Sequence, residues 1–441
     1  MWTTIWMFGF NPWLLSHVLA LEEPAQHLEI NPPHPQQVYR IQQTVFTLTE
    51  NNMSQTPTAR HVTEKKSLLQ RLARTQGRWN EHHPRHRLLE ALRGFSSYGE
   101  NNLAELNRLK DLYRHASKQQ KALLESTINY SSKFTSISDL VVKNQDLCDA
   151  IVRNALDFYH IDRAELERHT RGMTAAGRPA DKVSVSQALK HLVRDWSAQG
   201  ASERDAAYPC IVKALEGIAK RYYHHDQRLN VLLPGAGLGR LGHEISQLTP
   251  KFEVTNNEWS AYQNIIYRFL EANRQQNTIR PFIDTWSHHK TTPNMLRGVP
   301  FPDTPLNVDD VLLVEGDFTT TFSRETGYYD VVITHFFIDT ARNLMSYLDT
   351  IHRVLKKGGY WINFGPLLYG SAPFVQLSLE EVLVVAEAMG FSFSVGDVPQ
   401  GCGLESLEGK GVFGMEARYG FDERALTRNA YDAQFWVAQR W

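Results

Sequence analysis

The sequence predicts an α/β fold, in which a mostly parallel sheet carries helices on both faces and follows a helical section. Beyond about residue 180, short apolar segments alternate with segments of helical period, an alternation typical of a parallel sheet. Between residues 86 and 170, apolar residues recur at i, i+3, i+4 and i+7 without a strand-like interruption. We therefore expect an extension over residues 1–85, a helical section over 86–180, and an α/β domain over 181–441.

The composition is that of an ordinary globular chain. Of its 441 residues, 42% are hydrophobic and 22% are charged, which excludes wholesale disorder. The 47 basic and 48 acidic side chains leave a net charge of −1, so we expect no nucleic-acid partner and no membrane partner. Cys148, Cys210 and Cys402 are far apart and odd in number, which argues against a disulfide framework and favours a reducing compartment.

The first 85 residues show no clear folding pattern. Residues 1–21 lack acids, lysine and arginine, but no basic segment begins a signal peptide, and Asn11-Pro12 interrupts the apolar run. We interpret this stretch as a poorly ordered extension; a targeting segment and a stretch packed on the folded body stay open. Residues 22–85 predict a mobile lead-in with one helix near 58–78. No later segment is apolar enough to span a bilayer, which predicts a soluble protein.

Strands and helices alternate through the α/β domain. The predicted strands cover residues 229–233, 252–255, 311–314, 329–334 and 360–364, with further strands near 391–396 and 434–438. The predicted helices cover residues 240–248, 260–273, 343–356 and 378–389. Loops are expected over 172–179, at the residues 357–359 that would end a helix, and over 279–309, an insertion with five prolines.

A glycine-rich turn follows the first predicted strand and precedes a helix. Gly235, Gly237 and Gly239 leave backbone amides bare at a helix N-terminus, where a ligand can approach the main chain. Glu258 lies 23 positions after Gly235, at the end of the second strand, and is placed to accept both hydroxyls of a ribose. The turn and the acid together predict a cofactor that contains a nucleoside.

Two cofactors fit such a turn. A dinucleotide site needs a third glycine at position 240, where this chain has Arg240, whereas G-x-G-x-G is the spacing of S-adenosylmethionine sites. After the third strand, Asp317 can accept a hydrogen bond from an adenine amino group, and the aromatic Phe318 can cover the ring. We therefore favour S-adenosylmethionine and keep a nicotinamide cofactor as the alternative.

Several segments resemble the carnosine N-methyltransferase family over about residues 88–441. The segments are VLLPGAGLGRLGHEIS (231–246), NEWS (257–260), GDF (316–318), FFIDTARN (336–343), SYLDTIHRVLKKGGYWINFGPLLYG (346–370) and VRDWSAQGASERDAAY (193–208). The resemblance implies a class I methyltransferase with a Rossmann-like sheet. The near-neutral charge and the few cysteines fit a cytoplasmic enzyme, with the nucleus left open as a further location. It implies methyl transfer from S-adenosylmethionine to a ring nitrogen of the imidazole in carnosine, giving anserine; a homodimer is left open.

The resemblance also assigns residues to the cofactor. Arg194 would hold the methionine carboxylate as a two-pronged donor. His191 stands where the family has a glutamine, and His335 stands where it has a cysteine. The family contacts that carry over unchanged are Arg194, Gly235, Glu258, Asp317 and Phe318.

On the substrate side, the resemblance implies Asp339 and Tyr431, while Gly370 replaces a family histidine that contacts the dipeptide. We expect Asp339 to accept a hydrogen bond from the second ring N–H or from the peptide amine, the alternative being an N-cap for the next helix. Tyr369 either lines the pocket or packs under it, and His335 is a further catalytic candidate that can substitute for the missing histidine. The donor is already activated, so positioning of a neutral imidazole suffices for transfer.

The remaining features predict structure. The pairs His224-His225 and His288-His289 lack a third ligand at a diagnostic spacing, so no metal site is expected. Trp196 and Trp259 are expected to anchor the core. Two alternatives to a small-molecule imidazole methyltransferase stay open: a methyltransferase acting on histidine in a peptide or protein, and a nicotinamide-dependent oxidoreductase.

Overall fold

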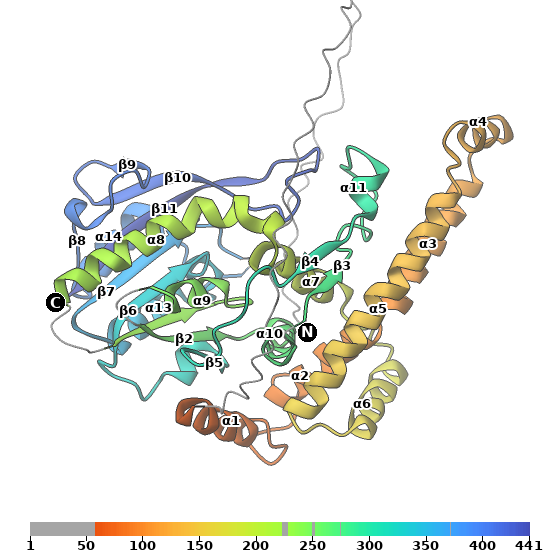
Figure 1. Cartoon of the computed structure of the whole chain (residues 1–441). Helices are drawn as coiled ribbons and strands as arrows, with labels where there is room; N and C mark the ends of the chain where they lie inside the picture. Colours follow the sequence, from red (N-terminus) through yellow and green to blue (C-terminus); the bar gives the residue numbers. More distant parts are fainter. Residues whose placement is uncertain (1–57, 223–227, 249–251, 274, 371) are drawn as a thin grey trace, which may run out of the picture. The chain divides into compact units, whose positions relative to one another are not determined.

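The computed structural model describes residues 58–222, 228–248, 252–273, 275–370 and 372–441, all within one compact unit. The predictions for residues 1–57, including the apolar start, lie outside the described residues. A helical section and a sheet with flanking helices make up the unit (Figure 1). No helix in these ranges is both long and apolar enough to cross a membrane.

Within the described residues, seven helices, from α1 to α7, make up the helical section. They are α1 (Ala59–Arg71), α2 (Pro84–Ser96), α3 (Tyr98–Arg114), α4 (Lys118–Ile128), α5 (Ser132–Phe158), α6 (Arg163–Ala175) and α7 (Lys182–Trp196). Helices α3 and α5 lie side by side, and α4 joins them at the tip of this arm (Figure 1). The loop expected from residue 172 begins only after Ala175, because α6 continues through Gly172.

Helix α1 corrects the expectation of a mobile lead-in for residues 58–71. It packs against β5 (Val311–Glu315), the edge strand of the sheet. The carbonyl of Val311 accepts from His61 Nε2 at 3.0 Å, and the carbonyl of Glu315 accepts from Arg71 Nη2 at 3.2 Å. The helix predicted near 58–78 is therefore present but shorter, and side-chain hydrogen bonds hold it against the sheet.

The sheet has nine strands, and its central strands are parallel. The strand order is β5-β2-β1-β6-β7-β11-β10-β9, with β8 also paired to β11. Strands β5, β2, β1, β6 and β7 pair in parallel, whereas β11 runs antiparallel to both β7 and β10. Besides β5, the strands are β1 (Leu229–Pro234), β2 (Phe252–Glu258), β6 (Tyr329–His335), β7 (Leu355–Gly365), β8 (Phe391–Phe393), β9 (Leu404–Leu407), β10 (Val412–Arg418) and β11 (Ala430–Arg440).

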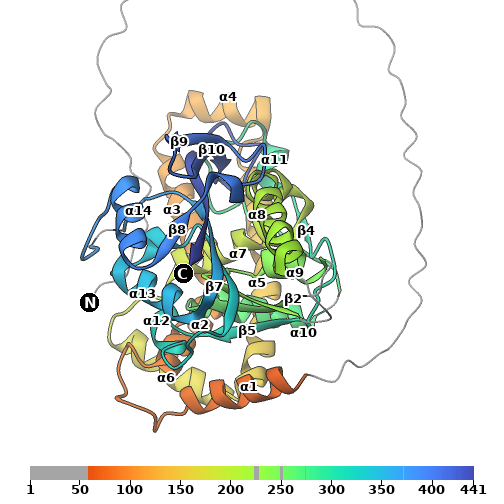
Figure 2. The same ribbon diagram turned by 90° about the vertical axis from the view of Figure 1, so that its left-hand side faces the viewer.

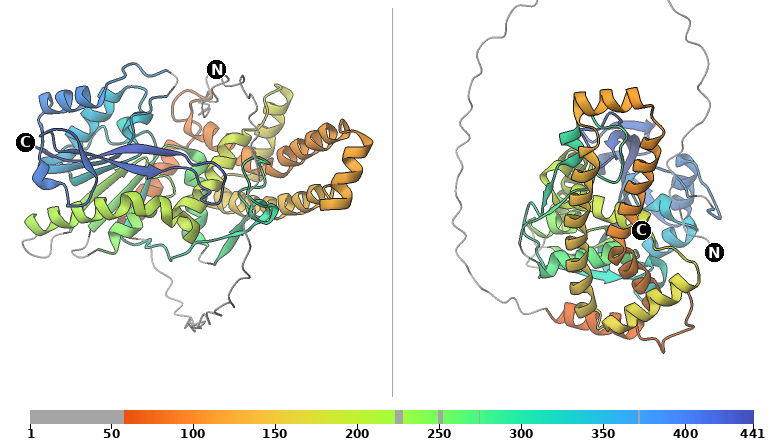
Figure 3. Two further views of the ribbon diagram at one scale, coloured as in Figure 1. Left: turned by 90° about the horizontal axis from the view of Figure 1, so that it is seen from above. Right: turned by 90° about the vertical axis from the view of Figure 1, so that its right-hand side faces the viewer.

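Helices cover both faces of the sheet, as predicted. Along β1, Val231 and Leu233 pack with α8 (Ala201–Tyr222) and α9 (Arg240–Ser246), while Leu232 packs on the opposite face. That face is covered by α12 (Phe318–Thr321), α13 (Leu344–Val354) and α14 (Leu379–Ala388). Figures 2 and 3 show the two helical layers on either side of the strands. A third cluster joins α10 (Ala261–Ala272) to the helical section.

Three local predictions were wrong. Residues 357–359 do not end a helix, because α13 stops at Val354 and these residues begin β7. Residues 279–309 are not a plain loop: β3 (Asn277–Ile279) and β4 (Val299–Phe301) form an antiparallel pair around α11 (Thr292–Leu296). The burial of Ile279 and Phe301 in the helical core gives this insertion its structure. Strands β9 and β10 were not predicted.

The cysteines also differ from expectation, because Cys210 and Cys402 form a disulfide. They are separated by 192 residues in sequence, yet their Cα atoms are 5.7 Å apart. Cys210 lies on α8 and Cys402 lies just before β9, and both side chains are buried in the same apolar cluster. The separation of the cysteines in the sequence did not predict this disulfide, because the fold brings the two segments together. Cys148 is free and buried.

A buried polar network joins the helical section to the sheet. The Arg268 Nε donates to Glu315 Oε1 at 2.9 Å, and the Tyr159 hydroxyl donates to Glu315 Oε2 at 3.0 Å. Tyr159 lies directly after α5, whereas Glu315 ends β5. A carboxylate with both oxygens satisfied is tolerated in the interior, and losing one donor would leave an oxygen unpaired.

We therefore expect Tyr159→Phe to lower the free energy of unfolding by about 1 to 2 kcal/mol, the cost of a lost buried hydrogen bond. Urea unfolding at pH 7 measures this loss. The matched control is Tyr113→Phe, since the Tyr113 hydroxyl also donates to a glutamate, Glu125, at 2.7 Å but on the outer arm. An equal loss in both variants would contradict a special role for the buried network.

Candidate active site

The carboxyl ends of the parallel strands meet at one edge of the sheet. The glycine turn follows β1, Glu258 ends β2, and His335 ends β6. Backbone hydrogen bonds fix these ends to each other: the Ala236 N–H donates to the Asn257 carbonyl at 3.0 Å, and the Gly316 N–H donates to the Glu258 carbonyl at 2.9 Å. The residues that the sequence singled out therefore converge on this edge.

The glycine turn needs glycine for two physical reasons. Gly235, Gly237 and Gly239 all have positive φ angles, of 66°, 58° and 77°, a region that side chains with a Cβ rarely adopt. Space is also lacking, because a Cβ on Gly235 would overlap the Phe337 ring and one on Gly239 would lie 2.6 Å from the Asn256 amide nitrogen. The turn is thus held tight against the strands on either side.

Two acids hold the turn by its backbone amides. Glu258 Oε2 accepts from the Gly237 N–H at 2.9 Å, and its Oε1 accepts from the Ser260 N–H at 2.7 Å. Asp195, in the last turn of α7, accepts from the Leu238 N–H at 3.2 Å. Burial raises the pKa of Glu258 above its ordinary value, and its backbone hydrogen bonds oppose that shift. The predicted ribose acceptor therefore also fixes the turn.

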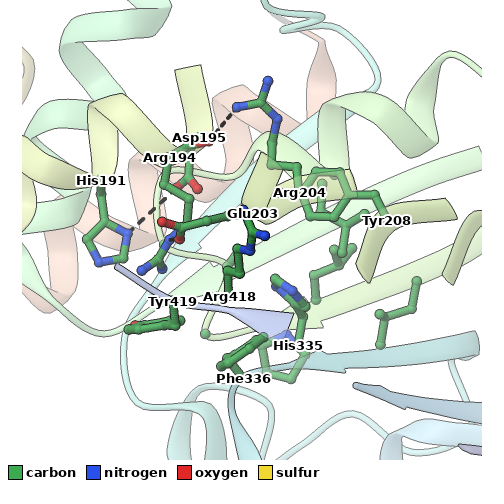
Figure 4. A pocket seen from close by; sticks show the side chains of 18 residues that line it. His191, Arg194, Asp195, Glu203, Arg204, Tyr208, His335, Phe336, Arg418 and Tyr419 are labelled. Carbon is green, nitrogen blue, oxygen red and sulfur yellow. Dashed lines mark hydrogen bonds and ion pairs between the residues drawn. The ribbon is translucent and has the colours of Figure 1, made fainter. Parts of the chain in front are cut away.

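Arg194 lies in a cavity beside this turn (Figure 4). Its Nε donates to Glu203 at 3.1 Å, and its guanidinium carbon is 4.0 Å from the centre of the Tyr419 ring. Its Nη2 is buried and has no hydrogen-bond partner among the described residues. An unpaired buried donor is costly, so this nitrogen is suited to an anionic ligand group in the cavity.

Two neutral histidines share the cavity with Arg194. Burial, followed by the positive charge of Arg194, lowers the pKa of His335 to about 4. The same two causes lower the pKa of His191, whose Nδ1 is 3.8 Å from Asp195 Oδ2 and has no hydrogen-bond partner in the described part of the chain. At pH 7 both rings are uncharged, which avoids repulsion with a cationic ligand.

An aromatic wall bounds one side of the cavity. The rings of Phe336 and Tyr419 stack with centroids 5.1 Å apart, and Tyr431 meets them at 6.1 Å and 5.9 Å, respectively. Phe336 has a φ of 50°, a strained value for a residue with a side chain, and its N–H donates to the Phe364 carbonyl. Phe336 and Tyr419 line the cavity, whereas Tyr431, the predicted substrate contact, packs against both rings without being among the lining residues.

Asp339 is a buried carboxylate outside the residues that line the cavity. Its side chain accepts from the Leu368 N–H at 3.0 Å, and only 4% of the residue is exposed. Burial raises its pKa to about 6. The N-cap alternative was wrong, because Asn343 occupies the cap position of α13 and Asp339 lies in a separate short turn, Ile338–Thr340. Nothing in its contacts requires a charged side chain for folding.

Tyr369 lies near Asp339 but has a structural partner. Its hydroxyl donates to the Leu377 carbonyl at 2.7 Å and accepts from the Leu377 N–H at 3.2 Å. The residue does not line the cavity that holds Arg194. Its contacts therefore favour packing, and a catalytic role stays a prediction. A Cβ added at Gly370 would meet no atom within 4 Å, so the position of the missing family histidine is open space.

Asp317 and Phe318 lie beyond the cavity, past the end of β5. Asp317 caps α12, accepting from the Thr319 N–H at 2.9 Å and the Thr320 N–H at 3.2 Å, both through Oδ1. Phe318 is buried, and its ring contacts those of Phe337 and Tyr347. The structure thus groups His191, Arg194, Gly235, Gly237 and His335 in one cavity and puts Asp317 and Phe318 to one side of it.

Several residues of the site were missed by the sequence analysis. Glu203 accepts from the Gly420 N–H at 3.0 Å, and so ties the segment beyond β10 to Arg194. Tyr419 follows β10, a strand that was not predicted, so no pattern placed it near the site. The segment 193–208 does carry the family resemblance, and this was the one signal for Glu203 and for Tyr208, which also lines the cavity.

One expectation about a single residue needs correction, that for Trp259. Arg240, at the position where a dinucleotide site needs glycine, pairs with Glu244 at 2.8 Å and with Asp303 at 2.5 Å. Trp196 is fully buried, as expected, but Trp259 is 56% exposed and anchors no core. Within the described ranges, no group of three His, Cys, Asp or Glu side chains is placed to hold a metal ion.

The sheet order and the site together define a class I methyltransferase. A glycine turn follows the first strand, an acid ends the second, and β11 is inserted antiparallel between β7 and β10. The sequence profile described as carnosine N-methyltransferase matches residues 173–441, and the chain belongs to this family. The predicted family and fold class are confirmed, and the nicotinamide oxidoreductase is not favoured.

Two curated relatives agree with this assignment. The carnosine N-methyltransferase of Mus musculus is 31% identical over 320 residues, which cover 69% of this chain and 78% of the relative. The carnosine N-methyltransferase of Schizosaccharomyces pombe is 29% identical over 343 residues, which cover 72% of this chain and 85% of the relative. Among solved structures, magnesium protoporphyrin IX methyltransferase of Synechocystis has a TM-score of 0.32 and 11% identity, and the match covers 55% of this chain and 83% of that one.

Proposed function

We propose that this protein transfers the methyl group of S-adenosylmethionine to a ring nitrogen of the imidazole in carnosine or a related histidine dipeptide. With carnosine the product would be anserine. The observation that carries the proposal is the unpaired, buried Nη2 of Arg194, which lies in a cavity beside the glycine turn. It supplies the donor that the carboxylate of an amino-acid-like cofactor requires. The names of the family and of its curated members support the choice of substrate.

The residues around the turn fit the rest of the cofactor. Each oxygen of Glu258 accepts one backbone N–H, so lone pairs remain for the two ribose hydroxyls. The backbone hydrogen bonds of Asp317 use Oδ1, so we assign its Oδ2 to the adenine amino group. Phe318 would pack against the adenine, and the neutral rings of His191 and His335 would lie near the sulfonium without repelling it.

Methyl transfer requires little of the protein beyond positioning the cofactor and the imidazole. When bound, S-adenosylmethionine would supply an activated methyl group: the N–C bond would form as the S–C bond breaks, S-adenosylhomocysteine would leave, and the methylated ring would lose its remaining N–H proton to solvent. The attacking nitrogen must be unprotonated, and an imidazole of ordinary pKa, about 6.5, meets this condition at pH 7. We assign Asp339 to accept a hydrogen bond from the other ring N–H or from the peptide amine. The aromatic wall that contains Tyr431 would hold the imidazole plane, and Tyr369 stays a candidate near Asp339.

Glu258→Ala should weaken the binding of S-adenosylmethionine at least tenfold, or by about 1.4 kcal/mol, because the ribose hydroxyls lose their acceptor. Titration calorimetry measures the change. Glu244→Ala is the matched control, since Glu244 is a glutamate of the neighbouring helix α9 whose partner is Arg240 and not the turn. An unchanged affinity in the Glu258 variant would refute the cofactor assignment.

The decisive experiment supplies labelled S-adenosylmethionine with carnosine, homocarnosine, free histidine and a histidine-containing peptide. We expect transfer to a ring nitrogen of the dipeptides, identified by mass spectrometry of the product. Preferential labelling of the peptide would instead identify a peptide histidine methyltransferase, for which the open space at Gly370 offers room. Absence of transfer to every imidazole would refute the proposal.

A further inference from the structure

A stacked pair, Arg87 and Trp259, joins the helical section to the end of β2. Arg87 lies in α2, and its guanidinium carbon is 3.5 Å from the centre of the Trp259 ring. Its Nη2 donates to the Trp259 carbonyl at 2.7 Å, so the arginine grips both the ring and the backbone of this residue. Despite these contacts Trp259 is 56% exposed, since the arginine covers only part of the indole. Neither residue was singled out by the sequence analysis as part of a site.

The pair lies next to both acids assigned to the adenosine. Trp259 directly follows Glu258, and Glu258 pairs in register with Glu315, two residues before Asp317. Among the charges that act on Arg87, those of Asp317 and Glu258 are the largest and favour its protonated form. Burial acts in the opposite direction and lowers the pKa of Arg87 to about 10, which still leaves it charged at pH 7. A cation from the helical section, held against Trp259, therefore lies within electrostatic range of the two carboxylates.

We propose that Arg87 and Trp259 form a clasp over the adenosine end of the cofactor site, so that cofactor affinity depends on a residue of the helical section. The inference rests on the proposed use of S-adenosylmethionine. Trp259 would cover the nucleoside with its exposed indole surface, and Arg87 would hold the indole in place. Arg87 is here a positioning residue, because it acts on the cofactor through Trp259 and through the charges of Glu258 and Asp317.

Physical reasoning supports this division of roles. An indole fixed by a stacked guanidinium loses little side-chain freedom when a ligand packs on it, which lowers the entropic cost of binding. Displacing water from two neighbouring carboxylates is costly unless a cation remains beside them. Arginine supplies both effects because its planar group stacks on an aromatic ring and donates in a fixed direction.

The test compares the affinity of S-adenosylmethionine and of S-adenosylhomocysteine in the parent protein and four variants by calorimetry. We expect Arg87→Ala and Trp259→Ala each to weaken both ligands at least fivefold, because they share the adenosine. The double variant should bind each ligand at most about twofold more weakly than the weaker-binding single variant. The two residues are coupled, so either single substitution already removes their shared interaction. Arg87→Lys should recover little, because a lysine cannot stack and donate together.

Arg74→Ala is the matched control. Arg74 stacks on Trp79 with its guanidinium carbon 4.1 Å from the ring centre, in the same helical section but without a site acid among its partners. It should leave both affinities unchanged. The unfolding temperature without ligand distinguishes a positioning role from a structural one. Because Trp259 is exposed, Trp259→Ala should leave the unfolding temperature of the free protein unchanged. It should lose most of the increase in unfolding temperature that S-adenosylhomocysteine produces in the parent protein.

The outcomes are distinguishable. If the parent protein binds neither ligand, the proposed function fails and the clasp with it. If the parent binds both ligands and Trp259→Ala and Arg87→Ala bind as tightly, the clasp alone is refuted. If Arg74→Ala weakens binding as much as Arg87→Ala, the effect is general to the helical section, and the clasp is likewise refuted.

Discussion

Replacing Asp339 with asparagine is expected to abolish methyl transfer and, at the same time, to stabilise the protein at pH 8. Turnover should fall about a hundredfold or more, as when a positioned acid–base group is removed, while S-adenosylmethionine binds as before. The carboxylate is buried, and burial raises its pKa from 3.8 to about 6. A pKa raised by about two units corresponds to about 3 kcal/mol of free energy of unfolding, which the protein loses when the Asp339 carboxyl ionises.

The direction of the pH dependence follows from the raised pKa. In the parent protein, the contribution of Asp339 to stability is fully present below pH 4 and is lost as the pH rises through about 6. Asparagine stays neutral throughout and keeps an oxygen for the Leu368 N–H. The variant should therefore gain about 2 to 3 kcal/mol at pH 8 and nothing at pH 4.

Denaturant unfolding at both pH values, together with a labelled-methyl assay, measures these effects. Asp349→Asn is the control, since Asp349 is an exposed acid on α13 and should change neither quantity. Turnover in Asp339→Asn within a factor of about two of the parent would rule out the substrate role. A stability gain of the same size at pH 4 and pH 8 would rule out the buried charge as its cause.

Arg194→Gln should weaken S-adenosylmethionine at least a hundredfold, or by about 2.7 kcal/mol. The substitution removes the unpaired Nη2 of a residue that lines the cavity, and would leave the carboxylate of the cofactor without a charged donor. It also removes the Nε donor to one oxygen of Glu203, whose other oxygen accepts from the Gly420 N–H. Calorimetry with S-adenosylhomocysteine, which carries the same carboxylate, should report a loss of equal size.

Arg297→Gln provides the control for this substitution. Arg297 is also buried, pairs with Asp422 at 2.6 Å, and has its guanidinium carbon 3.9 Å from the centre of the Phe282 ring. Its loss should lower the stability without changing the affinity of the folded protein for the cofactor. A similar loss of affinity in both variants would show that Arg194 acts through the fold and not through a direct contact.

The sequence predicted the parallel half of the sheet better than the antiparallel half. Strands β1, β2, β5 and β6 are apolar runs bounded by glycine or polar residues, and they lie within a residue or a few of the predicted ranges. Strand β10 was missed because Gly414 and Glu416 interrupt its apolar pattern, although only residues 419–429 separate it from β11. Periodicity reports a strand only where apolar and polar residues alternate regularly.

The same contrast holds for the site. The glycine turn and Glu258 follow from spacing alone, since their roles depend on the backbone near each strand end. The surroundings of Tyr419 and Trp259 depend on where segments distant in the sequence meet. Their residue types alone therefore did not predict their contacts in the site. Asp339 was selected from the family resemblance. The structure adds that its carboxyl group is buried, which makes ionisation of the group unfavourable.

Helix α1 has a consequence for how the molecule behaves among its copies. A strand at the edge of a sheet displays unpaired backbone groups that can accept a strand from another chain. His61 and Arg71 occupy two of the carbonyls of β5, so the edge is covered by side chains rather than left free. Helix α1 thus leaves fewer backbone groups of β5 free to pair with a strand of a neighbouring molecule.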